Sequence, residues 1–144
     1  MGVISLTSCA SVDMVSNSQD VQSKKFENPP LDKAGLYIYR NSLIAPIVKI
    51  KISLDGVIIG ETANKVYFYK EISLGHHKLS TESEFSDNSL EFNARGGKNY
   101  FARQDIKIGV LSAAVDIIMV IEKEGKKQVR QCKQVKINNK LNTN

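Results

Sequence analysis

The sequence predicts an all-β fold: a β-sandwich of about seven to eight mostly antiparallel strands, with one possible short C-terminal helix. Three observations predict it. From Gly35 onward, apolar residues alternate with polar or aromatic ones at a period of two, as in strands that bury one face. Turn residues interrupt these runs at intervals of about 8 to 12 residues, which is typical of a sandwich. The pair Asp55-Gly56, placed between two apolar runs, is a strong local signal for a β-hairpin.

The first strands are predicted at residues 36–39 and 48–54. In the first, leucine and isoleucine alternate with two tyrosines, and in the second, apolar residues alternate with two lysines and a serine. Each pattern is typical of a half-buried strand with one face in water. The turn at Asp55-Gly56 then leads into a return strand at residues 57–61, because both central residues of such a turn take a positive φ.

Four more strands are predicted from alternation and from aromatic and β-branched residues, at residues 66–72, 77–85, 90–94 and 100–108. Gly96-Gly97 predicts a second hairpin, between the last two of them. Residues 115–121 are almost continuously apolar, which predicts a central strand covered on both faces. The pattern at residues 123–136 fits either a short helix against the sheet or an edge strand, and we favour the helix.

One folded domain is predicted, at residues 33–137. Residues 9–32 contain few large apolar side chains, so we expect a flexible linker there, with an end-to-end distance on the order of 25 Å. Residues 138–144 are expected to form a disordered tail. The longest apolar run, at residues 108–121, is shorter than the roughly 20 residues of a membrane-spanning helix, so no span is expected.

The stretch Leu6-Thr7-Ser8-Cys9 carries the sharpest functional signal. It resembles the lipobox of bacterial lipoprotein precursors, with an aliphatic residue three positions before the cysteine and a small residue just before it. The resemblance implies that residues 1–8 are the remnant of a signal peptide and that Cys9 carries a palmitate-type lipid anchor. Because Ala10 rather than Asp follows, it also implies an outer-membrane anchor, with the domain facing the periplasm. The chain departs from a complete signal, since no basic start and no apolar stretch of about 7 to 15 residues precedes Cys9.

Five segments resemble, as an ordered set, the small bacterial lipoproteins that carry the domain of unknown function DUF2846. They are residues 33–40, residues 54–62, Tyr67-Phe68-Tyr69, Gly75-His76-His77 and residues 96–101. A looser similarity, Asp-Gly then Gly-x-Thr then Gly-His, is to the PEGA-type β-sandwiches of bacterial surface proteins. The resemblance implies localisation and fold, because the family has no assigned activity.

The net charge of +5 raises the question of a nucleic-acid partner. The positive charge is spread along the chain and is densest between Lys123 and Lys140. We interpret this run as a solvated face rather than a polyanion site, because exposed lysines also keep sheet edges from pairing. No nucleic-acid partner is expected.

The two histidines, His76 and His77, are adjacent. In an extended chain their side chains point to opposite faces, so they are not expected to bind one metal ion together, and we expect both at the surface. Among the acidic residues, Glu82 and Glu84 share a strand face. With Asp87 and Asn88 just beyond, they fit a loose calcium site or an acid–base pair less well than a solvated acidic edge.

No Gly-x-Ser-x-Gly motif and no cysteine set beside a histidine is present, so the sequence indicates no enzyme and no cofactor. A hydrolase built on Glu82 or His77 is the weakest of three functional hypotheses. Cys132 is expected to be packed rather than reactive, although a disulfide to Cys9 is an alternative.

Tyr67, Tyr69 and Tyr100 are the candidate ligand or partner surface, because alternation turns about half of the aromatic rings in this region outward. The competing interpretation is that these rings form cross-strand pairs that stabilise the sheet. The sequence therefore favours a lipid-anchored envelope protein whose domain is a protein-interaction or structural module. The alternative is a carbohydrate-binding or peptidoglycan-binding module.

Overall fold

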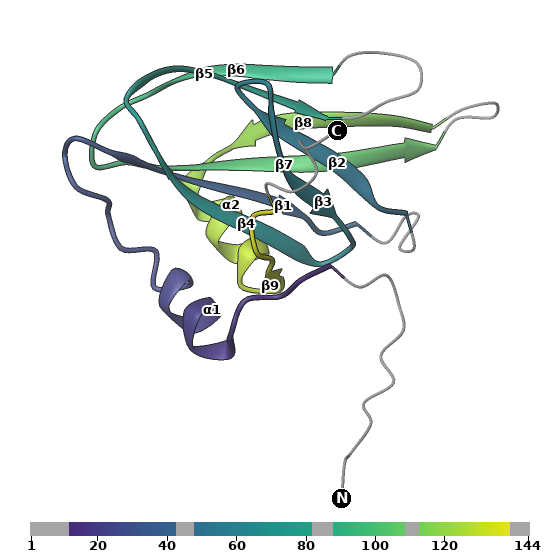
Figure 1. The fold of residues 1–144 in the computed structure, drawn as a ribbon, viewed down its shortest axis with the longest axis horizontal. Helices are drawn as coiled ribbons and strands as arrows, with labels where there is room; N and C mark the ends of the chain where they lie inside the picture. The colour runs from purple at the N-terminus through teal and green to yellow at the C-terminus, as the bar shows by residue number, and fades with distance from the viewer. Residues whose placement is uncertain (1–11, 43–47, 82–87, 109–112, 139–144) are drawn as a thin grey trace, which may run out of the picture.

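Two β-sheets pack face to face in the computed structural model, which describes residues 12–42, 48–81, 88–108 and 113–138 (Figure 1). The five-stranded sheet has the order β8-β7-β1-β4-β9, and the four-stranded sheet has the order β3-β2-β5-β6. The elements are α1 (Asn17–Ser23), β1 (Ala34–Arg40), β2 (Ile50–Leu54), β3 (Val57–Thr62), β4 (Val66–Ile72), β5 (Gly75–Thr81), β6 (Asn88–Ala94), β7 (Asn99–Ile108), β8 (Ala113–Val120), α2 (Glu122–Val129) and β9 (Lys133–Gln134). The predicted all-β sandwich is confirmed, and so is the short C-terminal helix.

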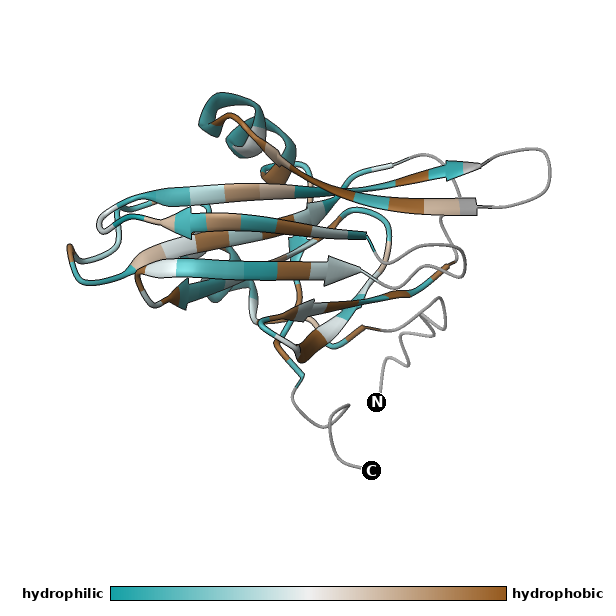
Figure 2. Cartoon of the chain, turned by 90° about the horizontal axis from the view of Figure 1, so that it is seen from above, coloured by the Kyte–Doolittle hydropathy of each residue, from teal (hydrophilic) through white to brown (hydrophobic). Residues whose placement is uncertain are grey.

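Most neighbouring strands are antiparallel, and the pairs β1–β7 and β4–β9 are parallel. The hairpin at Asp55-Gly56 is confirmed: the two residues have φ angles of 52° and 83°, and β2 pairs with β3 around them. Figure 2 shows hydrophobic and hydrophilic residues alternating along the strands, which is the pattern that predicted them.

The second predicted hairpin, at Gly96-Gly97, is wrong, because β6 and β7 belong to different sheets. The two glycines carry the chain from one sheet to the other and lie against the segment before β1. A Cβ atom on Gly96 would lie 1.8 Å from the backbone oxygen of Leu31. The backbone N–H of Gly97 donates to the carbonyl oxygens of Pro30 and Lys33, at 3.2 and 2.9 Å. The pair therefore permits a close backbone approach rather than a tight hairpin.

The prediction of a central strand at residues 115–121 is also wrong, because β8 lies at the edge of the five-stranded sheet, where Ile118 is 39% exposed. The strand that is buried on both faces is β1, all seven of whose residues are buried. Its tyrosines were expected to face water. They are covered instead, because both helices and the segment after α1 pack on the outer face of this sheet.

The predicted flexible linker is wrong for residues 12–32. Met14 pairs with Val135 next to β9, and the Ser16 side chain caps α1 by accepting a hydrogen bond from the Gln19 backbone. Phe26 is buried against the sheet. The composition of this segment is polar, but a single phenylalanine and a few backbone groups are enough to fix it onto a surface of tyrosines. At the other end of the domain, the backbone N–H of Asn138 donates to Ile59, and residues 139–144 of the predicted tail lie outside the described residues.

The domain has two main hydrophobic clusters, one on each face of the five-stranded sheet. The first lies between the sheets and is mostly aliphatic, with Phe68 as its largest member. The second lies between the five-stranded sheet and the two helices, and we call it the aromatic core. It consists of Phe26, Tyr37, Tyr39, Tyr67, Phe101, Val129 and Cys132. Among the residues that the structure describes, neither helix is long and apolar enough to cross a membrane.

Candidate functional site

The three candidate tyrosines do not form one surface. Tyr67 and Tyr69 lie on the outer face of β4, whereas Tyr100 on β7 packs on the opposite face of the sheet, against Phe92, with ring centroids 5.4 Å apart. The Tyr100 hydroxyl accepts a hydrogen bond from the Arg95 backbone at 2.8 Å. Residues paired across neighbouring strands point to the same face of a sheet, so the pairing of Tyr100 with Leu36 places Tyr100 on the inner face. The sequence alone does not show this register, and a shift of one residue would reverse the face.

Tyr67 is fully buried, so the prediction that it offers a ring to a ligand is wrong. Its hydroxyl donates to the Asp20 carboxylate of α1 at 2.7 Å. Burial, together with that hydrogen bond to Asp20, raises the pKa of Tyr67 far above its ordinary value. Lys24 in turn binds the same carboxylate at 3.1 Å. These contacts show that Tyr67 holds the N-terminal helix on the sheet.

Tyr69 is the candidate that borders an open cavity, which we call the Tyr69 cleft. The cleft has a volume of about 260 Å³ and lies between α1, the segment after it, and the outer face of β1 and β4. The Tyr69 ring is half-buried and packs on Tyr37, with centroids 4.6 Å apart. Burial and then the neighbouring Glu71 carboxylate raise the pKa of Tyr69. The cleft is lined by Gln19, Gln22, Ser23, Glu27, Asn28, Pro29, Pro30, Tyr37, Tyr69 and Glu71.

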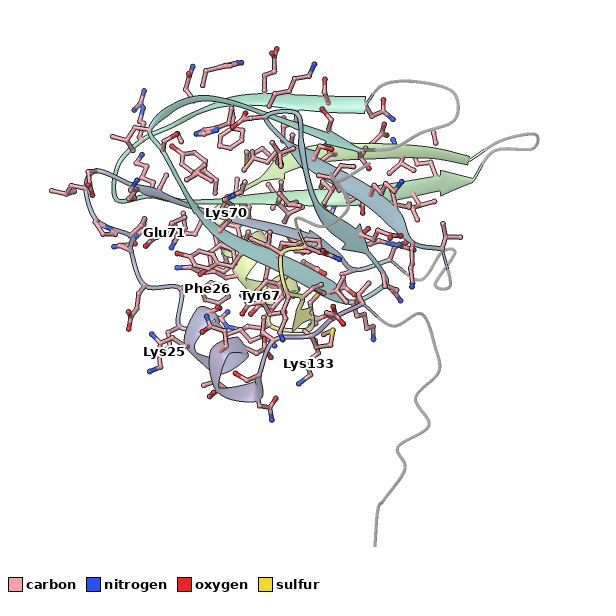
Figure 3. All side chains as sticks on the ribbon, viewed as in Figure 1. Lys25, Phe26, Tyr67, Lys70, Glu71 and Lys133 are labelled. Carbon is pink, nitrogen blue, oxygen red and sulfur yellow. The ribbon has the colours of Figure 1, made fainter. Side chains whose placement is uncertain are left out.

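The Tyr69 cleft combines polar and acidic side chains with an aromatic surface formed by Tyr37 and Tyr69. Glu27 and Glu71 are exposed carboxylates, and the side chains of Gln19, Gln22 and Asn28 supply amides. Figure 3 places Glu71 on the same side of the molecule as Phe26 and α1. Beyond Tyr69, this site could not be predicted from the sequence, because seven of its ten lining residues come from the segment that was predicted to be a linker.

His77 is buried, so the prediction of a surface histidine is wrong for it, whereas His76 is exposed and lies 3.3 Å from Glu91. The two ring nitrogens of His77 contact the Asp55 carboxylate and the Ser73 carbonyl oxygen, both at 2.6 Å. The Ser73 hydroxyl lies 3.4 Å from the same nitrogen. The His77 ring thus joins a carboxylate of one turn to a backbone oxygen of another, so this group fastens the two turns together.

The stability of this turn depends on pH through the Asp55 carboxyl group. Burial acts to raise its pKa, but the hydrogen bonds from the Lys78 backbone and from His77 outweigh burial and lower it below the ordinary value. The stability that Asp55 contributes is therefore fully present above the ordinary pKa of Asp and is lost as the pH falls through the lower folded-state pKa.

We expect Asp55→Asn to lower the free energy of unfolding at pH 7 by about 1 kcal/mol, because Asp55 is partly exposed and water screens its bond to His77. Urea unfolding followed by circular dichroism should show this difference shrinking as the pH falls below the ordinary pKa of Asp and the carboxyl group of the natural protein becomes protonated as well. The exposed Asp32→Asn is the matched control and should behave like the natural chain. A difference that stays constant from pH 7 to pH 2 would rule out this role for Asp55.

Other candidate groups give no site. Glu82, Glu84 and Asp87 lie outside the described residues, and Asn88 begins β6, where its side chain donates to the Val115 carbonyl oxygen. In the described part of the chain, no group of three or more His, Cys, Asp or Glu side chains could hold a metal ion.

The predicted packing of Cys132 is confirmed. The thiol is buried, and burial raises its pKa to about 12 despite the positive charges of Lys24 and Lys65. A thiol with such a pKa is a poor nucleophile at neutral pH. Cys9, the predicted lipidation site, lies outside the described residues together with the rest of the lipobox.

The comparisons with known proteins agree with the resemblance to proteins that carry the domain DUF2846. The family model described as "Protein of unknown function (DUF2846)" matches residues 30–116, which run from the end of the N-terminal segment into β8. An uncharacterized protein of Haemophilus influenzae (strain KW20 / Rd) is 44% identical over 124 residues, covering 86% of this chain and 74% of that protein. This chain belongs to the DUF2846 family.

Proposed function

We propose that this protein is a lipid-anchored protein of the bacterial cell envelope, attached through Cys9 to the outer membrane, whose periplasm-facing domain binds a partner protein at the Tyr69 cleft. The anchor is supported by the lipobox-like sequence before Cys9. The binding role is supported by the cleft itself, which joins an aromatic wall to two carboxylates outside the packed cores. The cleft is the single observation on which the binding role depends.

The cleft favours a ligand with a positive charge. Glu27 and Glu71 supply negative charge at its rim, and the face of the half-buried Tyr69 ring can accept a cation, an interaction worth about 0.5–1 kcal/mol at an exposed site. Tyr37 supports that ring from behind, so little side-chain entropy is lost on binding. A segment of an envelope protein that presents a lysine or arginine side chain fits this chemistry.

The second candidate function is binding of a carbohydrate or of peptidoglycan. It is favoured by the amide and carboxylate groups next to Tyr69, because sugars are bound by such groups together with an aromatic face. Sedimentation of the pure domain with cell-wall sacculi separates the two functions. Pelleting that Tyr69→Ala abolishes would support the carbohydrate function over the protein-binding one.

The anchor is tested on the native protein. Mass spectrometry of the protein from membrane fractions should show a lipid on Cys9, and Cys9→Ser should move the protein out of those fractions. Recovery of the native chain from the soluble fraction with an unmodified Cys9 would contradict the proposed anchor.

Binding at the cleft is tested by placing a photo-crosslinking residue at position 71 in living cells. We expect a discrete crosslinked envelope protein, and we expect Tyr69→Ala to reduce its yield about tenfold, which corresponds to about 1.4 kcal/mol for a lost aromatic contact. A crosslinker at Glu91, an exposed carboxylate of the four-stranded sheet, is the matched control and should give no such product. Equal amounts of crosslinked product from both positions, or a yield that Tyr69→Ala leaves unchanged, would contradict the proposal that a partner binds at the Tyr69 cleft.

A further inference from the structure

The distance between the proposed anchor and the folded domain is short. Only two residues separate Cys9 from Val12, the first described residue, and a chain spans at most about 3.6 Å per residue, so the two Cα atoms lie within about 11 Å of each other. Val12 packs against the core between the sheets. The next residues are fixed by backbone hydrogen bonds from Lys136 to Asp13 and from Val15 to Gln134, at 2.7 and 3.1 Å. The flexible tether that the sequence predicted is therefore not available to hold the domain away from the membrane.

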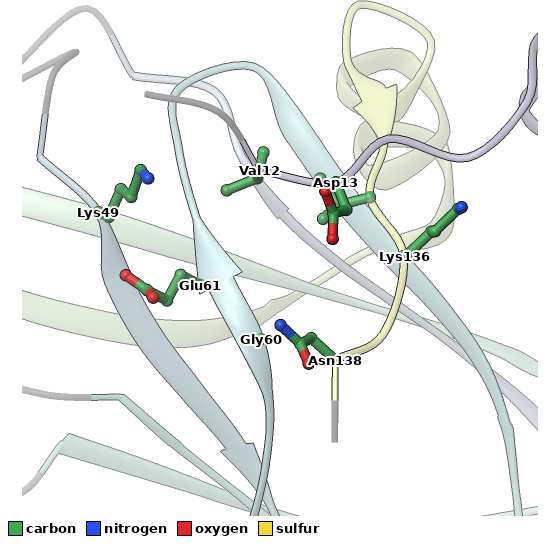
Figure 4. Close-up of a pocket in the computed structure, with 8 residues that line it drawn as sticks. Val12, Asp13, Lys49, Gly60, Glu61, Lys136 and Asn138 are labelled. Carbon is green, nitrogen blue, oxygen red and sulfur yellow. The ribbon is translucent and has the colours of Figure 1, made fainter. Parts of the chain in front are cut away.

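The surface around this point of the fold is basic. Figure 1 shows the chain entering the fold at the end of the molecule that carries α1 and β9, while β5 and β6 lie at the other end. Lysines 25 and 133 lie at the same end in Figure 3, and Lys136 lies beside Val12 and Asp13 in Figure 4. We call this surface the basic face. It consists of Lys24, Lys25, Lys65, Arg130, Lys133 and Lys136.

Contacts between separate segments bring these cations together. Lys24 at the end of α1 donates to the carbonyl oxygen of Cys132, which precedes Lys133, and the backbone of Lys133 donates to Lys65 at 3.0 Å. The Arg130 guanidinium lies 5.2 Å from the ring of Phe26, next to Lys25. Three carboxylates belong to these segments: Asp20 pairs with Lys24, Asp13 lies beside Lys136, and Glu27 lines the Tyr69 cleft. The six cations of the basic face exceed these three anions, so the face keeps a net positive charge.

We propose that the basic face lies directly on anionic lipid headgroups when Cys9 is anchored. This inference rests on the proposed lipid anchor, because a lipid within about 11 Å of Val12 places this end of the domain, and no other, at the membrane surface. Lysines close to an anionic membrane each contribute to binding, and a lipid chain combined with a basic patch binds more firmly than either alone. Met14 and Val21, which are 41% and 60% exposed, add apolar side chains to the same segments.

The test uses the full chain with Cys9→Ser, so that no lipid is attached, and measures its co-sedimentation with vesicles. We expect at least tenfold tighter binding to phosphatidylglycerol–phosphatidylcholine vesicles than to pure phosphatidylcholine. The triple variant Lys25→Glu, Lys133→Glu, Lys136→Glu should lower that binding at least tenfold. The control triple Lys70→Glu, Lys78→Glu, Lys98→Glu changes the net charge equally at exposed positions outside the basic face and should change binding less than twofold.

Equal losses in the two triple variants, or no preference for phosphatidylglycerol, would overturn the proposal. Binding of a short DNA duplex as tight as binding to the vesicles would overturn the assignment to lipid. If the triple variant does not fold, chemical acetylation of lysines in the vesicle-bound chain tests the same proposal. We expect the membrane to protect Lys25, Lys133 and Lys136 from acetylation and to leave the control lysines reactive. The Cys9→Ser chain carries no lipid, so a failure to bind vesicles would not contradict the acylation of Cys9. Conversely, an unmodified Cys9 in cells would not change the result of the vesicle experiment.

Discussion

A chain cut to residues 30–116, the range that the family model matches, is expected to lose cooperative folding. The cut removes α1, α2, β9 and the second half of β8, and so it removes Phe26, Val129 and Cys132 from the aromatic core. Loss of one buried phenylalanine costs about 3–5 kcal/mol, and the whole stability of a small domain is about 5–15 kcal/mol. The remaining tyrosines and Phe101 would face water on a sheet that has lost β9 and half of β8, the partner strand of β7.

Urea unfolding followed by circular dichroism measures this effect. A chain of residues 12–138 is the control and should unfold in one cooperative transition, with the same midpoint as the full chain. A cooperative transition for residues 30–116 with a similar midpoint would contradict the view that the aromatic core is part of the fold.

Gly125→Ala is expected to destabilise the protein by about 1–3 kcal/mol, although alanine is the better helix former by about 1 kcal/mol. The reason is contact between α2 and the sheet: a Cβ atom at position 125 would lie 2.3 Å from Cγ of Phe101. The helix must therefore move off the aromatic core to accept a methyl group. Lys127→Ala at an exposed position of the same helix is the control and should change the free energy of unfolding by less than about 0.5 kcal/mol. A Gly125→Ala protein that is more stable than the natural chain would show that α2 does not rest on Phe101.

The strands and the hairpin at Asp55-Gly56 could be predicted because their signals are local. A period of two and a pair of residues that accept positive φ are properties of a few neighbouring residues, whatever the rest of the chain does. The eight longer strands all appear close to their predicted positions.

The arrangement of the strands could not be predicted in the same way, because it depends on contacts between distant segments. The apolar run of β8 buries its inner face against β5 and β6, whereas α2 packs on β7 and β1, and Ile118 on the outer face of β8 stays exposed. The tyrosines of β1 have the spacing of a solvent-facing side of a strand, and they are buried because Phe26 and both helices cover them. Gly96-Gly97 has the composition of a hairpin, but its role is set by the approach of Leu31.

The candidate site shows the same limit. Tyr69 could be found from its place in an aromatic strand. Tyr100 does not belong to the site, because it lies on the opposite face of the sheet from Tyr67 and Tyr69. Tyr67 is not available to a ligand, because α1 buries it. The carboxylate of Glu27 and the amide of Asn28 belong to a segment whose packing no local pattern reveals. They enter the cleft because Asn99 on β7 holds that segment, donating to the carbonyl oxygens of Phe26 and Glu27 at 3.3 and 3.1 Å.

The position of the N-terminal segment connects fold to function, because it lines the Tyr69 cleft and shortens the distance from the domain to Cys9. Hydrogen–deuterium exchange of the backbone amides of residues 20–26 tests that position most directly. If the segment is part of the fold, the amides of Lys24 and Phe26, which donate to Asp20 and Ser23, should exchange at least a hundredfold more slowly than in an unstructured peptide. Exchange at the rate of a free peptide, in a chain whose strand β1 stays protected, would contradict the account.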